Sequence, residues 1–206
     1  MTTDDTNHPV SEATSPHAWI DESSIERVAE GPGGFYVLAA VIASPLDCEA
    51  CRMDLAALLP KGADRLHWRD ESASQRRKIV DAITGYGLTN LVVISDQADS
   101  RKQERARRKG MERMLVELAS LGVAQVVIEA RTKALNSRDQ SLVATLRTSG
   151  ALPTRMRVDF ESPKTEPMLW IPDAVAGATG LAHRGGDASF LSELSEVIVE
   201  IDLRSA

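Results

Sequence analysis

The sequence predicts one α/β domain of three layers, in which a mixed β-sheet lies between helices on both faces. Residues 35–43 (FYVLAAVIA) form an apolar run without alternation, which is typical of a central strand buried on both faces. The early strand-like segments follow one another, whereas the later ones alternate with helical segments. At 206 residues, the chain has the length of one domain with a full core.

Seven segments have strand character. In 17–23 an apolar pair is followed by acids, and in 64–70 Leu66 and Trp68 alternate with His67 and Arg69, as in a half-buried strand. The last segment, VIVEIDL, is rich in β-branched residues. The predicted strands cover residues 17–23, 35–43, 64–70, 88–95, 124–131, 155–162 and 197–203.

The connecting segments have helix signals. Asp47 is placed to cap one helix, Ser72 or Ser74 a second and Asp139 a third, while Gly122 follows the longest helical pattern as its stop. The predicted helices cover residues 48–58, 72 or 74 to 86, 100–121, 139–149, 167–182 and 188–196. Residues 1–16 are polar without periodicity, so we expect a disordered tail before a single domain over 17–206.

The composition indicates a cytoplasmic protein. Its apolar runs are far shorter than the roughly 18–20 residues of a membrane span, so no membrane association is expected, and no secretory signal is evident. Two cysteines do not make a disulfide framework. The net charge of −6 argues against a nucleic-acid coat protein, but it is compatible with a nucleic-acid enzyme that has clustered acids and a local basic patch.

Several acids lie in apolar surroundings. Because side chains alternate along a strand, Asp21 shares a face with Trp19, whereas Glu22 lies on the other face unless the strand ends between them. Glu129 follows the apolar residues of a strand, and Asp173 lies in an apolar helical segment. These acids come from segments that are far apart in the sequence.

A divalent-cation site explains such acids, because a buried ionised carboxylate is costly unless it is paired or binds a metal. Oxygen ligands suit Mg²⁺ or Mn²⁺, and two such ions activate water at a phosphodiester. The predicted ligands are Asp21, Glu22, Glu129, Asp139 and Asp173. The alternatives are a solvated Asp21, a surface or ion-paired Glu22, Glu129 paired with Arg131, and plain helix caps at Asp139 and Asp173.

Short motifs then resemble a bacterial family of uncharacterised ribonuclease H-like domains. They occur in the order WIDESS, FYVLAAVIA, HWRD, VVIEAR, NSRD and LWIPDAVAGA, over about residues 17–180. The family opens with an Asp-Glu-Ser-Gly strand motif and has a late helical Asp before small residues. This chain has Ser24 in place of the family's Gly, and Pro172 in place of the Ala before the late Asp.

The resemblance implies a ribonuclease H-like fold and two-metal phosphodiester hydrolysis. Asp21 matches the first acid of the family and Asp173 the late one, while Glu129 and Asp139 fall where the intermediate acids lie. We therefore expect a Mg²⁺- or Mn²⁺-dependent nuclease that acts on DNA or RNA. The alternative is a non-catalytic ribonuclease H-like scaffold that binds a protein or nucleic acid, which the differences at Ser24 and Pro172 favour.

Two further features are candidates for this function. His67 is a predicted general acid or substrate contact near the metals, or else a surface residue of an edge strand. Residues 101–113 are strongly basic, and on a helix they would contact a phosphate backbone, or else form a solvated face in which Glu104 pairs with a nearby arginine. The predicted nucleic-acid contacts are Arg101, Lys102, Arg105, Arg108 and Lys109.

Overall fold

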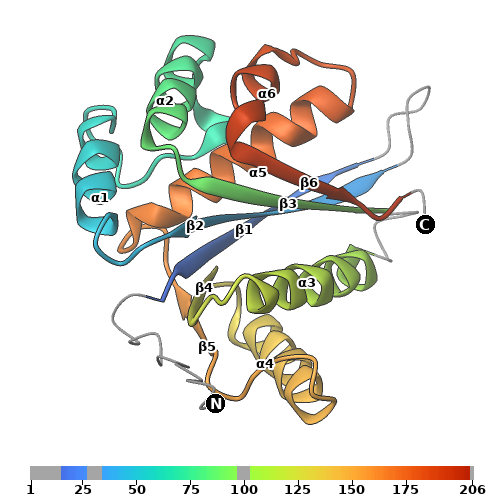
Figure 1. Ribbon diagram of the computed structural model, residues 1–206. Helices are drawn as coiled ribbons and strands as arrows, with labels where there is room; N and C mark the ends of the chain where they lie inside the picture. The colour runs from blue at the N-terminus through green and yellow to red at the C-terminus, as the bar shows by residue number, and fades with distance from the viewer. Residues whose placement is uncertain (1–14, 27–33, 97–102, 205–206) are drawn as a thin grey trace, which may run out of the picture.

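The computed structural model describes residues 15–26, 34–96 and 103–204 as one mixed sheet between two layers of helices (Figure 1). Most of the predicted N-terminal tail lies outside these ranges, as do Arg101 and Lys102. In the described part of the chain, no helix is both long and apolar enough to cross a membrane.

The sheet has six strands in the order β5-β4-β1-β2-β3-β6. β2 pairs antiparallel with β1 and with β3, whereas the β1–β4, β4–β5 and β3–β6 pairs are parallel. The predicted mixed sheet is thereby confirmed. The strands are β1 (His17–Ile25), β2 (Phe35–Ala43), β3 (Thr89–Asp96), β4 (Gln125–Glu129), β5 (Arg157–Glu161) and β6 (Ile198–Asp202).

Helices cover both faces of the sheet, as predicted. Helices α1, α2, α5 and α6 lie on one side, and α3 and α4 lie on the other (Figure 1). The helices are α1 (Cys48–Ala57), α2 (Ala73–Tyr86), α3 (Gln103–Ser120), α4 (Lys133–Thr148), α5 (Trp170–His183) and α6 (Ser189–Glu193). Short 3₁₀ helices η2 (Trp68–Asp70), η4 (Pro167–Leu169) and η5 (Ser195–Val197) complete them.

Strand β2 divides the apolar core into two parts. Val37 and Val41 face the core beneath α5, while Leu38 and Ala40 face the core beneath α3, and all four are fully buried. The absence of alternation in this segment therefore has the predicted cause. Helix α3 approaches β2 closely at Gly110, where a Cβ atom would lie 2.7 Å from a Leu38 methyl carbon.

The predicted strand over 64–70 is wrong. Leu66 and Trp68 are buried as its alternation indicated, but the chain turns into η2 at Trp68 and joins no sheet. The backbone of this segment forms hydrogen bonds with side chains and not with a neighbouring strand. The Trp68 N–H donates to Asp173, and the Trp68 and Arg69 carbonyls accept from the Arg76 guanidinium.

The predicted helix start at Asp139 is also wrong. Helix α4 begins at Lys133, with Thr132 in the N-cap position, so Asp139 lies inside the helix. Its side chain is buried and bonded to arginines from other segments, as described below. Partners that are distant in the sequence, and not the local cap, determine the position of this acid.

Candidate functional site

The parallel pairing of β1 with β4 brings two acids together. Trp19 lies opposite Val127 and Ile20 opposite Ile128, so the next residues of the two strands are Asp21 and Glu129. Trp19 and Val127 belong to the core beneath α5, and strand alternation places Asp21 and Glu129 on that same face.

Asp21 is buried, with only 7 % of the residue exposed. Burial raises its pKa well above the usual value, and a hydrogen bond with Glu129 and the charges of Asp173 and Glu129 raise it further. The Glu22 N–H, which donates to Asp21 Oδ1 at 2.7 Å, acts in the opposite direction. Arg65 is the nearby cation, 3.8 Å from Glu129 Oε1.

Asp173 lies in the first turn of α5 and forms hydrogen bonds with His67 and with Trp68 at the start of η2. Its Oδ2 accepts the Trp68 N–H at 2.7 Å, and both carboxylate oxygens lie 3.3–3.4 Å from His67 Nδ1. The hydrogen bond with Asp173 raises the pKa of His67, although burial opposes this shift. The structure thus joins the predicted catalytic pair His67 and Asp173 and places them near Asp21.

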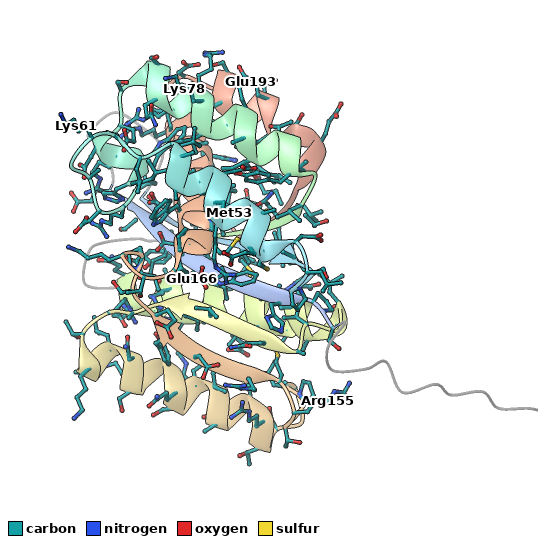
Figure 2. All side chains as sticks on the ribbon, turned by 90° about the vertical axis from the view of Figure 1, so that its left-hand side faces the viewer. Met53, Lys61, Lys78, Arg155, Glu166 and Glu193 are labelled. Carbon is teal, nitrogen blue, oxygen red and sulfur yellow. The ribbon has the colours of Figure 1, made fainter. Side chains whose placement is uncertain are left out.

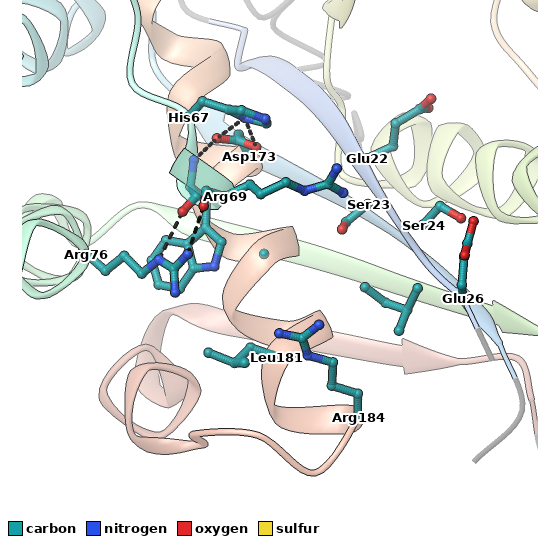
Figure 3. A pocket seen from close by; sticks show the side chains of 13 residues that line it. Glu22, Ser23, Ser24, Glu26, His67, Arg69, Arg76, Asp173, Leu181 and Arg184 are labelled. Carbon is teal, nitrogen blue, oxygen red and sulfur yellow. Dashed lines mark hydrogen bonds and ion pairs between the residues drawn. The ribbon is translucent and has the colours of Figure 1, made fainter. Parts of the chain in front are cut away.

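A pocket of about 640 Å³ opens beside this group (Figure 3). The second half of β1 forms one wall with Ser23 and Ser24, and α5 contributes Asp173 and Arg184. The segment that carries Arg69 forms another wall. The β1–β4 pairing ends at Ile20, so the part of β1 that lines the pocket lies beyond it.

Two glycines of α5 allow the pocket walls to approach one another. A Cβ atom on Gly177 would overlap with the Trp68 ring, and one on Gly180 would lie 2.6 Å from a methyl carbon of Ile25. The structure shows that the close contacts are with Trp68 and the end of β1.

The side-chain carboxylates of Glu22 and Asp139 do not join that of Asp21. Arg107 of α3, only 2 % exposed, donates to Glu22 through Nε and to Asp139 through Nη1. Arg131 adds a contact to Asp139 at 3.3 Å and lies 3.8 Å from Glu22. We therefore remove Asp139 and Glu22 from the predicted ligand set, because both carboxylates already have arginine partners.

Glu104 of the basic segment pairs with Arg131 at 2.8 Å, and not with a neighbour on its own helix. Arg105, Arg108 and Lys109 are exposed on α3, which covers the face of the sheet opposite to α5 (Figure 1). Lys109 Nζ lies 3.5 Å from the Leu203 carbonyl. The structure thus places these predicted nucleic-acid contacts on the other side of the sheet from Asp173.

Asp21 and Glu129 form a pair and Asp173 lies near them, but the three carboxylates do not form a complete coordination shell for a metal ion. Among residues 15–26, 34–96 and 103–204, no group of three or more His, Cys, Asp or Glu side chains is arranged to hold a metal ion. Asp21 and Glu129 share a hydrogen bond, while the oxygens of Asp173 are directed to His67 and Trp68.

Sequence reasoning did not identify Arg69 and Arg184, which also line the pocket. Single arginines in polar segments carry no periodic or motif signal. The only available indication was the position of Arg69 beside His67 and Trp68.

Comparisons with solved structures agree with this architecture. Ribonuclease HII of Archaeoglobus fulgidus, solved in complex with PCNA, matches with a TM-score of 0.52 at 16 % identity, covering 87 % of this chain and 76 % of the other. A variant of Bst-RNase HIII matches with a TM-score of 0.51, and Bst-RNase HIII in complex with Mn²⁺ with 0.50. Both are 16 % identical and are covered over 54 % of their length, against 89 % of this chain.

This chain therefore spans about half the length of RNase HIII. The likeness shows that the fold is ribonuclease H-like, which confirms the predicted fold class. No protein-family model and no curated protein sequence matches the chain.

Proposed function

We propose that the protein is a divalent-metal-dependent nuclease that hydrolyses phosphodiester bonds of DNA or RNA. The observation that carries this proposal is the meeting of Asp21 and Glu129 on the α5 face of the sheet, within range of the Asp173 charge. The ribonuclease H-like fold supports it, because the solved structures named above are ribonucleases and one of them is in complex with Mn²⁺.

The donors fit a hard cation. Asp21 and Glu129 supply carboxylate oxygens, and Arg65 lies 3.8 Å from Glu129 Oε1. The charge of Glu129 raises the pKa of Asp21, and a bound Mg²⁺ or Mn²⁺ relieves repulsion of this kind. Asp21 and Glu129 would hold the ion, and Asp173 would join them as a third ligand only by leaving His67 and the Trp68 N–H, to which its oxygens are hydrogen-bonded. When bound, such ions activate a water molecule and stabilise the leaving oxygen of a phosphodiester.

His67 and Asp173 connect this group to the pocket. Asp173 lines the pocket and accepts from His67, and this bond favours the protonated imidazole. A protonated His67 at the pocket wall supplies a proton donor for a leaving oxygen or a cation for a phosphate. The bond to Asp173 also fixes which ring nitrogen faces the carboxylate.

The experiment compares cleavage of single- and double-stranded DNA and RNA in Mn²⁺, in Mg²⁺ and in EDTA. Asp21→Asn is expected to abolish cleavage and to weaken Mn²⁺ binding in calorimetry. Asp81→Asn, which changes an exposed acid of α2, is the matched control. A wild-type protein that neither cleaves any of these substrates nor binds Mn²⁺ would overturn the proposal.

A non-catalytic scaffold is the second candidate, and a specific observation favours it. Both oxygens of Asp173 are engaged by His67 and the Trp68 N–H, and the Glu22 and Asp139 carboxylates are held by arginines. A scaffold predicts neither cleavage nor Mn²⁺ binding, so the same cleavage assays and calorimetry separate the two functions.

A further inference from the structure

We infer that Arg69 and Arg184 form a binding site for the phosphates of a nucleic-acid strand in the pocket beside Asp173. This inference rests on the proposed function and deepens it, because it assigns the residues that hold the substrate's backbone. Both arginines line the pocket, and they come from different elements, Arg69 from η2 and Arg184 from the C-cap of α5.

The guanidinium groups of Arg69 and Arg184 take no part in the contacts that hold the described part of the chain together. Neither makes a hydrogen bond or an ion pair with any residue of the described ranges, and both residues are exposed. Several other arginines of these ranges are engaged, as Arg52 is with Glu166 and Arg131 with Glu104. Figure 3 shows the Arg69 side chain reaching towards Ser23 and the Arg184 guanidinium directed towards the same cavity.

The backbone of Arg69 is held in place. Arg76 donates to the Trp68 carbonyl at 2.9 Å and to the Arg69 carbonyl at 3.2 Å, and its guanidinium lies 4.9 Å from the centre of the Trp68 ring. Trp68 in turn contacts α5 at Gly177 and packs edge-on against Phe190, with ring centres 5.2 Å apart. The fold thus fixes the main chain and leaves the Arg69 side chain available for a ligand.

Phosphate is the ligand class that these groups fit. Guanidinium groups bind phosphate oxygens through paired, charge-assisted hydrogen bonds. The Ser23 hydroxyl and the His67 imidazole on the pocket wall are further phosphate-compatible groups. Two arginines from two elements suit a ligand that carries more than one phosphate, and a nucleic-acid strand that reaches Asp173 has its neighbouring phosphates here.

The net charge of −6 disfavours binding of nucleic acid to the surface as a whole. The position of Arg69 and Arg184 beside Asp173 therefore matters for binding. The exposed cations of α3 lie on the opposite face of the sheet (Figure 1), so they do not adjoin Asp173. Arg69 and Arg184 are the arginines with unengaged guanidinium groups that the pocket presents beside the proposed catalytic carboxylate, whereas Arg76 and His67 there are already hydrogen-bonded.

The test measures binding of fluorescein-labelled oligouridylate and oligothymidylate by anisotropy, in EDTA and over a range of salt concentrations. Arg69→Gln and Arg184→Gln are each expected to weaken binding about fivefold to tenfold. Each is also expected to reduce the slope of log K against log salt by about 0.7, the value for one lost phosphate contact on a single strand. Arg69→Lys is expected to keep most of the slope, because it keeps the charge.

Arg155→Gln is the matched control. Arg155 is exposed, and Figure 2 shows it at the opposite end of the molecule from Lys78 and Glu193, beside the strand β5. Circular dichroism and urea unfolding serve to check that each variant is folded.

Wild-type affinity and salt slope in the double variant Arg69→Gln/Arg184→Gln would overturn the inference, as would an equal loss in Arg155→Gln. Failure of the proposed function is a separate result. Cleavage assays without any product would remove the nuclease, whereas arginine-dependent binding would still assign the pocket to nucleic acid.

Discussion

Glu22 and Arg107 bind each other on the face of β1 opposite to Asp21. Glu22 therefore makes contacts on both sides of the sheet, one through its backbone N–H and one through its side chain. Its N–H donates to the Asp21 carboxylate, while the Glu22 side chain is fixed by α3 and, through Arg107, by Asp139 of α4. The arginine cluster thereby stabilises the backbone that holds Asp21.

Arg107→Met is expected to destabilise the protein by about 3–5 kcal/mol, because it leaves the Glu22 and Asp139 carboxylates without their buried partner. Urea unfolding measures this loss. Arg113→Met is the control, since Arg113 is exposed and, among the residues that the structure describes, pairs only with Glu117 of the same helix, at 2.6 Å. Such an exposed pair contributes about 0.5 kcal/mol or less. Equal losses in the two variants would show that the buried cluster does not stabilise the fold.

Asp21→Asn is expected to stabilise the metal-free protein at neutral pH, by about 0.5–2 kcal/mol. The pKa of Asp21 is higher in the folded protein, because of burial, the bond to Glu129 and nearby charge. An acid of this kind favours folding when protonated, and that contribution is lost as the pH rises above its unfolded pKa of about 3.9 towards the folded value.

The measurement is urea unfolding in EDTA from about pH 4, close to the unfolded pKa of Asp, up to about pH 8. The stability difference between Asp21→Asn and the wild type is expected to widen as the pH rises. Asp81→Asn, which changes an exposed acid, provides the baseline. A difference that narrows with rising pH would contradict the assigned environment of Asp21.

Asp173→Asn is expected to lower the pKa of His67, because the hydrogen bond to Asp173 is the main cause of its raised value. The pair favours folding below the unfolded histidine pKa of about 6.5, and this contribution is lost as the pH rises through the folded value. NMR titration of the His67 ring measures the change directly. An unaltered titration midpoint would show that the two side chains are not bonded in solution.

The sequence was informative wherever a local period decides the outcome. Alternation along one strand predicted that Asp21 and Glu22 face opposite sides, and the unbroken apolar run predicted that β2 is buried on both faces. The ends of two apolar strands identified Asp21 and Glu129 as acids in unusual surroundings. Their contact depends only on the parallel register of β1 and β4.

Other parts of the site depend on contacts between distant segments. Asp139 has the sequence features of a helix cap, but the arginines that hold it come from α3 and from the segment after β4. Residues 64–70 alternate like a strand, yet Asp173 and Arg76 engage their backbone. Such pairings have no local signal, and they also decide which arginines remain available for a ligand.

Gly177→Ala is expected to disturb the pocket and to destabilise the protein by about 1–3 kcal/mol, the usual cost of overpacking a buried contact. The new methyl group would overlap with the Trp68 ring, which the neighbouring Phe190 and Arg76 hold in place. Displacement of Trp68 would also lengthen the bond from its N–H to Asp173.

Gly85→Ala is the matched control, because this helical glycine of α2 has no atom within 4 Å of the added Cβ. Alanine there is expected to stabilise the protein by about 0.4–1 kcal/mol through the lower entropy of the unfolded chain. Urea unfolding measures both effects, and NMR of the His67 ring reports on the pocket. Stabilisation by both alanines would show that α5 and Trp68 are not in contact, and the wall that carries Arg69 would then lack its anchor.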